Sequence, residues 1–225
     1  ETRTTIQNTY DLSGKSGYDN PPVFDSLSNR QKRSSGAMSD PQDSLKQLRK
    51  DAKAIFEAAL LAVDPYDAVC RNLRMDGEVL YVSGEALPCP RRVFVVGFGK
   101  AAAPMAQALE EILGDRIAGG AVTVKEGHAL PLGRVRVTEA GHPIPDERGL
   151  AGAGEIVRIL EPLRKDDLVL CVVSGGGSAL LPLPVEGVSL KEKGAATQAL
   201  MDAGATIHEM NAVRKHLSRV KGGRL

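Results

Sequence analysis

The alternation of strand-like and helix-like segments constrains the fold of this chain more than any other feature. Val93–Val96 and Leu168–Val173 are nearly continuous apolar runs, as expected of strands buried on both faces. Segments of helical length separate these and the other strand-like runs. Such alternation is typical of a mostly parallel sheet that is covered by helices on both faces.

The individual segments follow from apolar periodicity and from cap and turn residues. Asp40 and Asp64 each precede a proline, a common helix start, so we expect an N-terminal helix and a short second helix there. Ser189 and Thr206 each begin a capping box, so two further helices start at these residues. Strands are expected at 79–84, 91–99, 119–127, 134–141 and 168–173, and helices at 100–113 and 146–162. The fold class predicted is α/β, a Rossmann-like three-layer α/β/α domain preceded by N-terminal helices.

Composition narrows the function classes. The net charge is +1 over 225 residues, so bulk charge does not indicate a nucleic-acid or membrane surface. No apolar run is long enough to span a membrane, and the three cysteines lack metal-type spacing and fit a reducing cytoplasm. Cys171 is expected to be a small buried side chain within its strand. Residues 1–37 are polar and aperiodic, so we expect a disordered tail, a tag or an upstream segment there, with the folded domain at 38–225.

The strand at 168–173 runs directly into Ser174-Gly175-Gly176-Gly177-Ser178. Glycines cost backbone entropy, so a triplet predicts that another group approaches the backbone too closely for a Cβ. Successive glycine N–H groups can form an anion-binding concavity, and the two serine hydroxyls add donors. The spacing is neither that of a Walker A loop nor that of a nucleophile elbow. We interpret the loop as a phosphate site; a turn without a ligand is the alternative.

Gly97 and Gly99 follow another strand, and Lys100 begins the next helix. Gly97-x-Gly99-x-x-Ala102 matches the dinucleotide fingerprint, but Glu126 lies farther along the chain than the acidic residue that would complete it. A lysine in a glycine turn suits a phosphate or a developing oxyanion better than a nicotinamide ribose. The alternative is a tight turn with a surface lysine.

Two weaker signals remain. On the last helix, Asn211, Arg214 and Lys215 project away from the apolar side, which indicates either a binding stripe or a solvated face. His142 lies with Asp146 in the proline-rich segment GHPIPDE, where a lone histidine is more often structural than catalytic. The sequence predicts no metal site formed by protein side chains.

Four segments occur in one order along the chain: VVGFGKAA, AGHPIPDE, VVSGGGSALL and NAVRKHLSRVKGGRL. Together they resemble the N-terminal domain of the glycerate 2-kinases that carry a C-terminal MOFRL domain, over about residues 40–225. The resemblance implies phosphoryl transfer from ATP, with Mg²⁺, to the 2-hydroxyl of D-glycerate, giving 2-phosphoglycerate. It also implies that the chain stops within a family motif and lacks the MOFRL domain.

The resemblance assigns roles to residues. Lys100 corresponds to the family's catalytic lysine, and the loop Ser174–Ser178 and the stripe Asn211, Arg214 and Lys215 correspond to binding motifs. The full set expected to bind substrate or nucleotide is Gly97, Gly99, Ser174, Gly175, Gly176, Gly177, Ser178, Asn211, Arg214 and Lys215, with His142 and Lys221 as further candidates.

Three function classes stay open. The first is a cytoplasmic glycerate kinase that acts on a small molecule, with no nucleic-acid or membrane partner and with a homodimer as a compatible assembly. The second is an NAD(P)H-dependent hydroxypyruvate reductase, which accords with the partial fingerprint at Gly97. The third is a non-catalytic module that binds an anion or a nucleotide.

Overall fold

The computed structural model describes residues 41–225, and the chain divides into two units, Glu1–Asp51 and Ala52–Leu225. Helix α1 (Pro41–Ala62) begins at the proline where the sequence predicts the N-terminal helix. The predicted cap Asp40 and the predicted tail at 1–37 lie outside the described residues, so the domain boundary at 38 stays a prediction. Among the helices of residues 41–225, none combines the length and the apolar character that crossing a bilayer requires.

A four-stranded parallel sheet forms the centre of the second unit. In spatial order it consists of β6 (Val135–Ala140), β5 (Ile117–Lys125), β4 (Val93–Phe98) and β7 (Leu168–Val173). Strand β4 pairs in parallel with β5 on one side and with β7 on the other, and β5 pairs in parallel with β6. The predicted parallel sheet is therefore confirmed.

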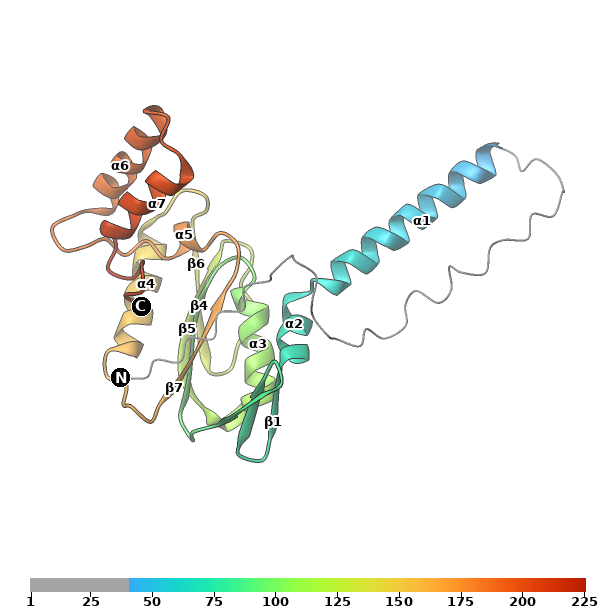
Figure 1. Ribbon diagram of the computed structural model, residues 1–225, viewed down its shortest axis with the longest axis horizontal. Helices are drawn as coiled ribbons and strands as arrows, with labels where there is room; N and C mark the ends of the chain where they lie inside the picture. Colours follow the sequence, from blue (N-terminus) through green and yellow to red (C-terminus); the bar gives the residue numbers. More distant parts are fainter. Residues whose placement is uncertain (1–40) are drawn as a thin grey trace. The chain divides into compact units, whose positions relative to one another are not determined.

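Helices cover both faces of this sheet, as Figure 1 shows. Helix α3 (Ala102–Leu113) presents small buried side chains, including Ala102 and Ala106, to one face, where they join the larger core cluster. Helix α4 (Glu147–Leu160) contributes Ala153 and Ile156 to a second cluster on the opposite face. Small residues let each helix approach the sheet closely. The three-layer arrangement is as predicted.

A second, antiparallel sheet precedes the parallel one and was not predicted. After α2 (Pro65–Asn72), the chain forms β1 (Leu73–Asp76), β2 (Val79–Val82) and β3 (Glu85–Pro88), paired in that order. The run at 79–84 was expected to be a strand and contains β2, but this strand pairs only with its neighbours in sequence. Short turns at Gly77 and Gly84, both with positive φ, return the chain on itself and favour local pairing.

Strand β7 corrects one expectation. Its apolar run predicts burial on both faces, yet Val173 is 54% exposed and Cys171 is exposed, whereas Val172 is buried. Helix α4 packs mainly against β5 and β6, and β7 is an edge strand, so one of its faces is left uncovered. An apolar run alone does not distinguish a central strand from an edge strand that is covered on one face.

The last three helices follow the glycine loop. They are α5 (Gly177–Leu180), α6 (Leu190–Asp202) and α7 (Ile207–His216). Both predicted capping boxes form: the Glu192 carboxylate accepts from the Ser189 N–H at 2.8 Å, and the Glu209 carboxylate accepts from the Thr206 N–H at 2.8 Å. The starts of α6 and α7 are therefore confirmed.

Candidate functional site

The two glycine turns meet at one edge of the parallel sheet. Because β4 and β7 are parallel neighbours, with Phe98 opposite Val173, their carboxyl ends reach the same edge. There the Lys100 N–H donates to the Gly175 carbonyl at 2.9 Å, and the Ser174 N–H donates to the Phe98 carbonyl at 3.2 Å. The structure thus brings together Lys100 and the predicted loop Ser174–Ser178. Ligands of open α/β sheets bind at such an edge.

Ser174 joins the two turns through its side chain. Its hydroxyl oxygen accepts a hydrogen bond from the Ala101 N–H at 2.9 Å. Ala101 is the N-cap of α3 and supplies no side-chain cap of its own. The serine therefore satisfies one of the free N–H groups at the start of α3 and fixes the lysine turn against the glycine loop.

Packing within the protein explains most of the glycines at this edge. A Cβ at Gly97 would contact the side chain and carbonyl of Val172, and one at Gly99, where φ is +128°, would lie 2.6 Å from the Ser174 carbonyl oxygen. A Cβ at Gly177 would lie 2.6 Å from the Phe98 ring. Among the loop glycines, Gly175 alone would place its Cβ in open space. The binding roles predicted for these glycines stay predictions, because contacts inside the chain already require them.

His142 reaches the same place from a third loop. It is half-buried and follows β6. A Cβ at Gly176 would lie 2.9 Å from His142 Nε2 and 3.4 Å from Lys100 Cγ. Lys100, His142 and the backbone of Gly176 therefore converge from the ends of β4, β6 and β7. This arrangement supplies a cation and an imidazole around one stretch of accessible backbone.

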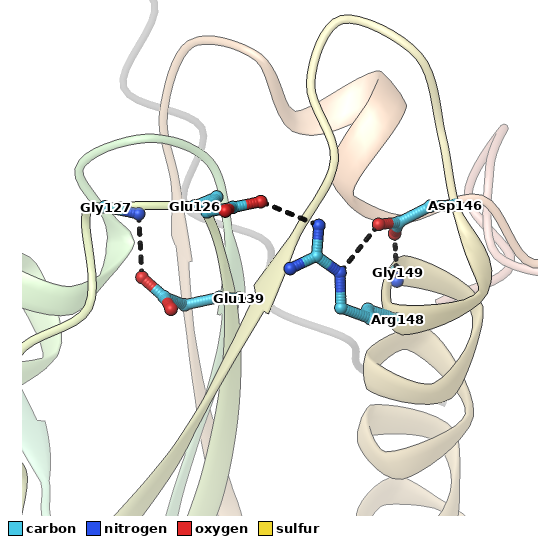
Figure 2. A network of polar contacts seen from close by, with 6 residues as sticks. All are labelled: Glu126, Gly127, Glu139, Asp146, Arg148 and Gly149. Atoms are coloured by element: carbon cyan, nitrogen blue, oxygen red, sulfur yellow. Dashed lines mark hydrogen bonds and ion pairs between the residues drawn. The ribbon is translucent and has the colours of Figure 1, made fainter.

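A network of polar contacts holds the loop of His142 in place (Figure 2). The Asp146 carboxylate caps α4 by accepting from the Gly149 N–H at 2.9 Å, and it also accepts from Arg148 Nε at 2.8 Å. The other side of the guanidinium donates to Glu126, just beyond β5, at 2.8 Å. Glu139 of β6 accepts from the Gly127 N–H at 2.8 Å. Arg148 thus ties the end of β5 to the start of α4.

The charges in this network reinforce one another. Burial alone would raise the pKa of Asp146, but hydrogen bonds from Gly149, Arg148 and Gly141 outweigh it and hold the pKa below its usual range. The hydrogen bond to Glu126, followed by the bond to Asp146, raises the pKa of Arg148. Arg148 was not predicted from the sequence, although Asp146 at a helix start is the signal for such a cap.

A pocket of about 410 Å³ opens beside the glycine loop. Helix α7 contributes Asn211, Arg214 and Lys215 to its wall, and the segment after α7 contributes Lys221. The other lining residues are Phe98, Ser178, Leu181, Val220, Gly222 and Leu225. The stripe predicted on the last helix therefore faces the same pocket as Ser178 of the loop.

Backbone pairing positions the segment that carries Lys221. The Arg219 N–H donates to the Leu183 carbonyl at 3.1 Å, and the buried hydroxyl of Ser218 donates to the same carbonyl at 3.2 Å. Since residues 181–184 follow the glycine loop directly through α5, these bonds attach the end of the chain to the loop's own continuation.

Sequence reasoning missed Lys193, on the first turn of α6. The residue is 7% exposed, and within residues 41–225 its Nζ has no hydrogen-bond partner. Burial, followed by the charge of Arg214, lowers its pKa to about 8. Burial also lowers the pKa of Lys221 to about 8, with contributions from Lys193 and Arg214. No sequence motif distinguishes Lys193 from a solvent-exposed helix lysine, so the sequence does not indicate that its side chain is buried.

Metal ligands do not gather at this edge. Within residues 41–225, no group of three or more His, Cys, Asp or Glu side chains is placed to hold a metal ion. The site's chemistry, as far as the described side chains supply it, is cationic and hydrogen-bonding.

Known proteins resemble this chain over most of its length. A Pyrococcus horikoshii protein named glycerate 2-kinase is 45% identical over 178 residues, which cover 79% of this chain and 40% of that protein. An Agrobacterium vitis protein named "Putative hydroxypyruvate reductase" is 44% identical, over 79% of this chain and 38% of its own length. A crystal structure of glycerate kinase from Thermotoga maritima superposes with a TM-score of 0.68 at 41% identity, over 80% of this chain and 41% of that one.

The chain therefore spans about 40% of the length of the relatives it matches. A protein-family model matches residues 51–225 of the chain. This range includes all four segments on which the predicted resemblance rests. That match and the α/β architecture agree with the expected N-terminal domain of glycerate kinase type. The chain belongs to the family described as Domain of unknown function (DUF4147).

Proposed function

We propose that this chain forms the N-terminal part of a glycerate 2-kinase, which transfers the γ-phosphoryl group of ATP to the 2-hydroxyl of D-glycerate. One observation carries the proposal: two groups of residues, each with at least one lysine, border a single glycine loop. Lys100 and His142 lie on one side of this loop at Gly176, and Arg214, Lys215 and Lys221 line the pocket that includes Ser178. Both substrates of the reaction are anions, so each can be held by one of these groups.

The chemistry fits the residues present. Phosphoryl transfer depends on positioning and on neutralising charge far more than on covalent catalysis. Lys100 is exposed and its Cγ lies beside the loop backbone at Gly176, so its compact ammonium can stabilise charge that grows on the transferred group. We assign Lys100 the catalytic role and assign substrate binding to the loop and to the pocket residues of α7.

Magnesium enters the proposal with the nucleotide. Mg²⁺ in kinase sites usually binds to the substrate phosphates and to one or two carboxylates. Among the described residues, no group of three or more His, Cys, Asp or Glu side chains is placed to hold a metal ion, so we assign the ion to none of them. Bound Mg²⁺ would neutralise phosphate charge in addition to what Lys100 supplies.

The cellular location that we propose follows from the same function. A kinase that acts on a metabolite works where ATP is abundant, and the three free cysteines fit a reducing compartment. We therefore place the protein in the cytoplasm, with D-glycerate as its small-molecule partner. A homodimer remains compatible with this function.

A hydroxypyruvate reductase is the second candidate, and the name of the A. vitis relative favours it. A dinucleotide site of that kind uses an acidic residue near the end of the second strand to bind the ribose. The acidic residue in that place is Glu126, and it is already paired with Arg148 at 2.8 Å. Because the Glu126 carboxylate already binds Arg148, it is not free to bind a ribose. The kinase is therefore the better-supported of the two candidates.

Calorimetric titration separates the candidates. The kinase proposal predicts that the purified chain binds ATP, with or without Mg²⁺, and does not bind NADH or NADPH. Binding of NAD(P)H together with failure to bind ATP would contradict the proposal. Formation of 2-phosphoglycerate from ATP and D-glycerate would separate a kinase from a module that binds without turnover.

A further inference from the structure

Lys193 is an unusual lysine because its charged end is buried and unpaired. Its residue is 7% exposed, and its Nζ has no hydrogen-bond partner within residues 41–225. A lysine on a protein surface normally extends its ammonium group into water while its stem covers apolar atoms. An ammonium that is buried without a partner is costly, so such a group in a native fold requires an explanation.

The charged neighbours of Lys193 are cations. Arg214 of α7 lies close enough to lower its pKa, and Lys221 in turn feels the charges of Lys193 and Arg214. The ion pairs within residues 41–225 include none that involves these three side chains. These three positive side chains come from α6, α7 and the following segment, and each lacks an ion-pair partner in the part of the chain that the structure describes. Like charges disfavour one another's charged form, so a bound anion would stabilise all three.

The position of this cluster indicates the kind of anion. Arg214 and Lys221 line the 410 Å³ pocket together with Ser178 of the glycine loop. Lys215 also lines the pocket and is the third positive side chain at its wall, whereas Lys193 is not one of the lining residues. A group with two negative charges and several acceptor oxygens can interact with three cations at once, whereas a single carboxylate offers less charge and fewer acceptor positions. These are the properties of a phosphate group.

We propose that Lys193, Arg214 and Lys221 form one binding site for a phosphate group, supplied either by a nucleotide or by a phosphate ester. This site shares no residue with the one at Lys100 and His142. The inference rests on the proposed function only for the source of the phosphate. Binding of the anion favours the charged form of each lysine, so the complex takes up protons from solution above pH 8, where the free lysines are largely neutral.

Isothermal titration calorimetry with the full chain tests the proposal. ADP and 2-phosphoglycerate are titrated separately at pH about 8.5, each in two buffers that differ in their heat of ionisation. The difference between the buffers gives the number of protons taken up. We expect the wild-type chain to bind at least one of the two compounds with proton uptake, and the compound that does so identifies the source of the phosphate.

Lys193→Met removes the charge and keeps a side chain of similar length. We expect it to bind the same compound at least about tenfold more weakly, as removal of a charged hydrogen-bond partner does, and with reduced proton uptake. Lys191→Met is the matched control, because Lys191 lies on the same helix and is exposed; it should bind as the wild-type chain does. If Lys193→Met does not fold, Lys221→Met takes its place, since Lys221 is only partly buried.

Two results would overturn the proposal: unchanged affinity and unchanged proton uptake in the Lys193→Met chain, or no binding of either compound by the wild-type chain. Phosphate binding that depends on Lys193, together with no glycerate kinase activity in a full-length protein that carries this sequence, would instead overturn the proposed reaction and leave this site standing. Failure of the site and failure of the reaction are therefore distinguishable.

Discussion

His142 Nε2 lies 2.9 Å from the point that a Cβ at Gly176 would occupy. The loop after β6 and the loop after β7 are thus in contact through a side chain on one and bare backbone on the other. Lys100 completes the group, since its Cγ lies 3.4 Å from the same point. The candidate site depends on this contact. Substituting single glycines of the loop tests whether the contact is present.

Gly176→Ala should destabilise the protein and weaken anion binding. The residue has a φ of +89°, and the added methyl group would meet His142. Adopting that backbone conformation costs a non-glycine residue about 1–2 kcal/mol, so the free energy of unfolding should fall by at least that much. Urea denaturation measures it. Gly175→Ala is the control, because its methyl group would enter open space, and it should leave stability nearly unchanged. Equal losses in both variants would contradict the contact.

Arg148→Met should loosen the loop that carries His142. Arg148 is the connection between Glu126 and Asp146, so its removal frees the segment 141–146 from the end of β5. Hydrogen exchange of amides in that segment should become faster by about tenfold or more, which corresponds to a loss of about 1.4 kcal/mol in local stability. Arg158→Met provides the comparison, because Arg158 pairs with Glu155 farther along the same helix. Unchanged exchange in Arg148→Met would show that the network does not hold the loop.

Alkaline pH should stabilise the protein through Lys193. The pKa of its ammonium is about 8 in the folded state against 10.5 for an ordinary lysine, so between these values the unfolded chain binds more protons than the folded one. The contribution of this residue to stability is therefore complete above pH 10.5 and is lost as the pH falls through about 8. Urea denaturation across this window should show a smaller rise with pH for Lys193→Met than for the wild-type chain. Identical pH profiles would mean that Lys193 titrates as an exposed lysine.

The sequence predicts the central architecture because several independent signals agree there. Apolar runs mark β4 and β7, and the capping boxes at Ser189 and Thr206 mark the starts of α6 and α7 to the residue. The segment of β2 was predicted as a strand, but β1 and β3 were not, because each has four residues and is too short to show a clear alternation. The antiparallel sheet was therefore not predicted.

The site was predictable in part. Lys100 and the loop Ser174–Ser178 stand at strand ends, where topology alone brings them to one edge. The reason for two of the loop glycines was not predictable: the sequence predicts that a Cβ is excluded, but only the fold shows that His142 meets a Cβ at Gly176 and Phe98 meets one at Gly177. The burial of Lys193 and the exposure of Cys171 depend on which neighbouring elements cover them. The local sequence indicates neither the burial of Lys193 nor the exposure of Cys171.

The most direct test of the account is the turnover of Lys100→Met in a full-length protein that carries this sequence. ATP-dependent formation of 2-phosphoglycerate from D-glycerate is measured beside ATP affinity, with Lys100→Arg as a second variant. If Lys100 stabilises charge in the transition state, Lys100→Met should lose about a hundredfold or more in kcat while it retains most of its ATP affinity. Lys100→Arg should also fail, because a planar guanidinium does not replace a compact ammonium beside the glycine loop. Near-normal kcat in Lys100→Met would contradict the catalytic assignment.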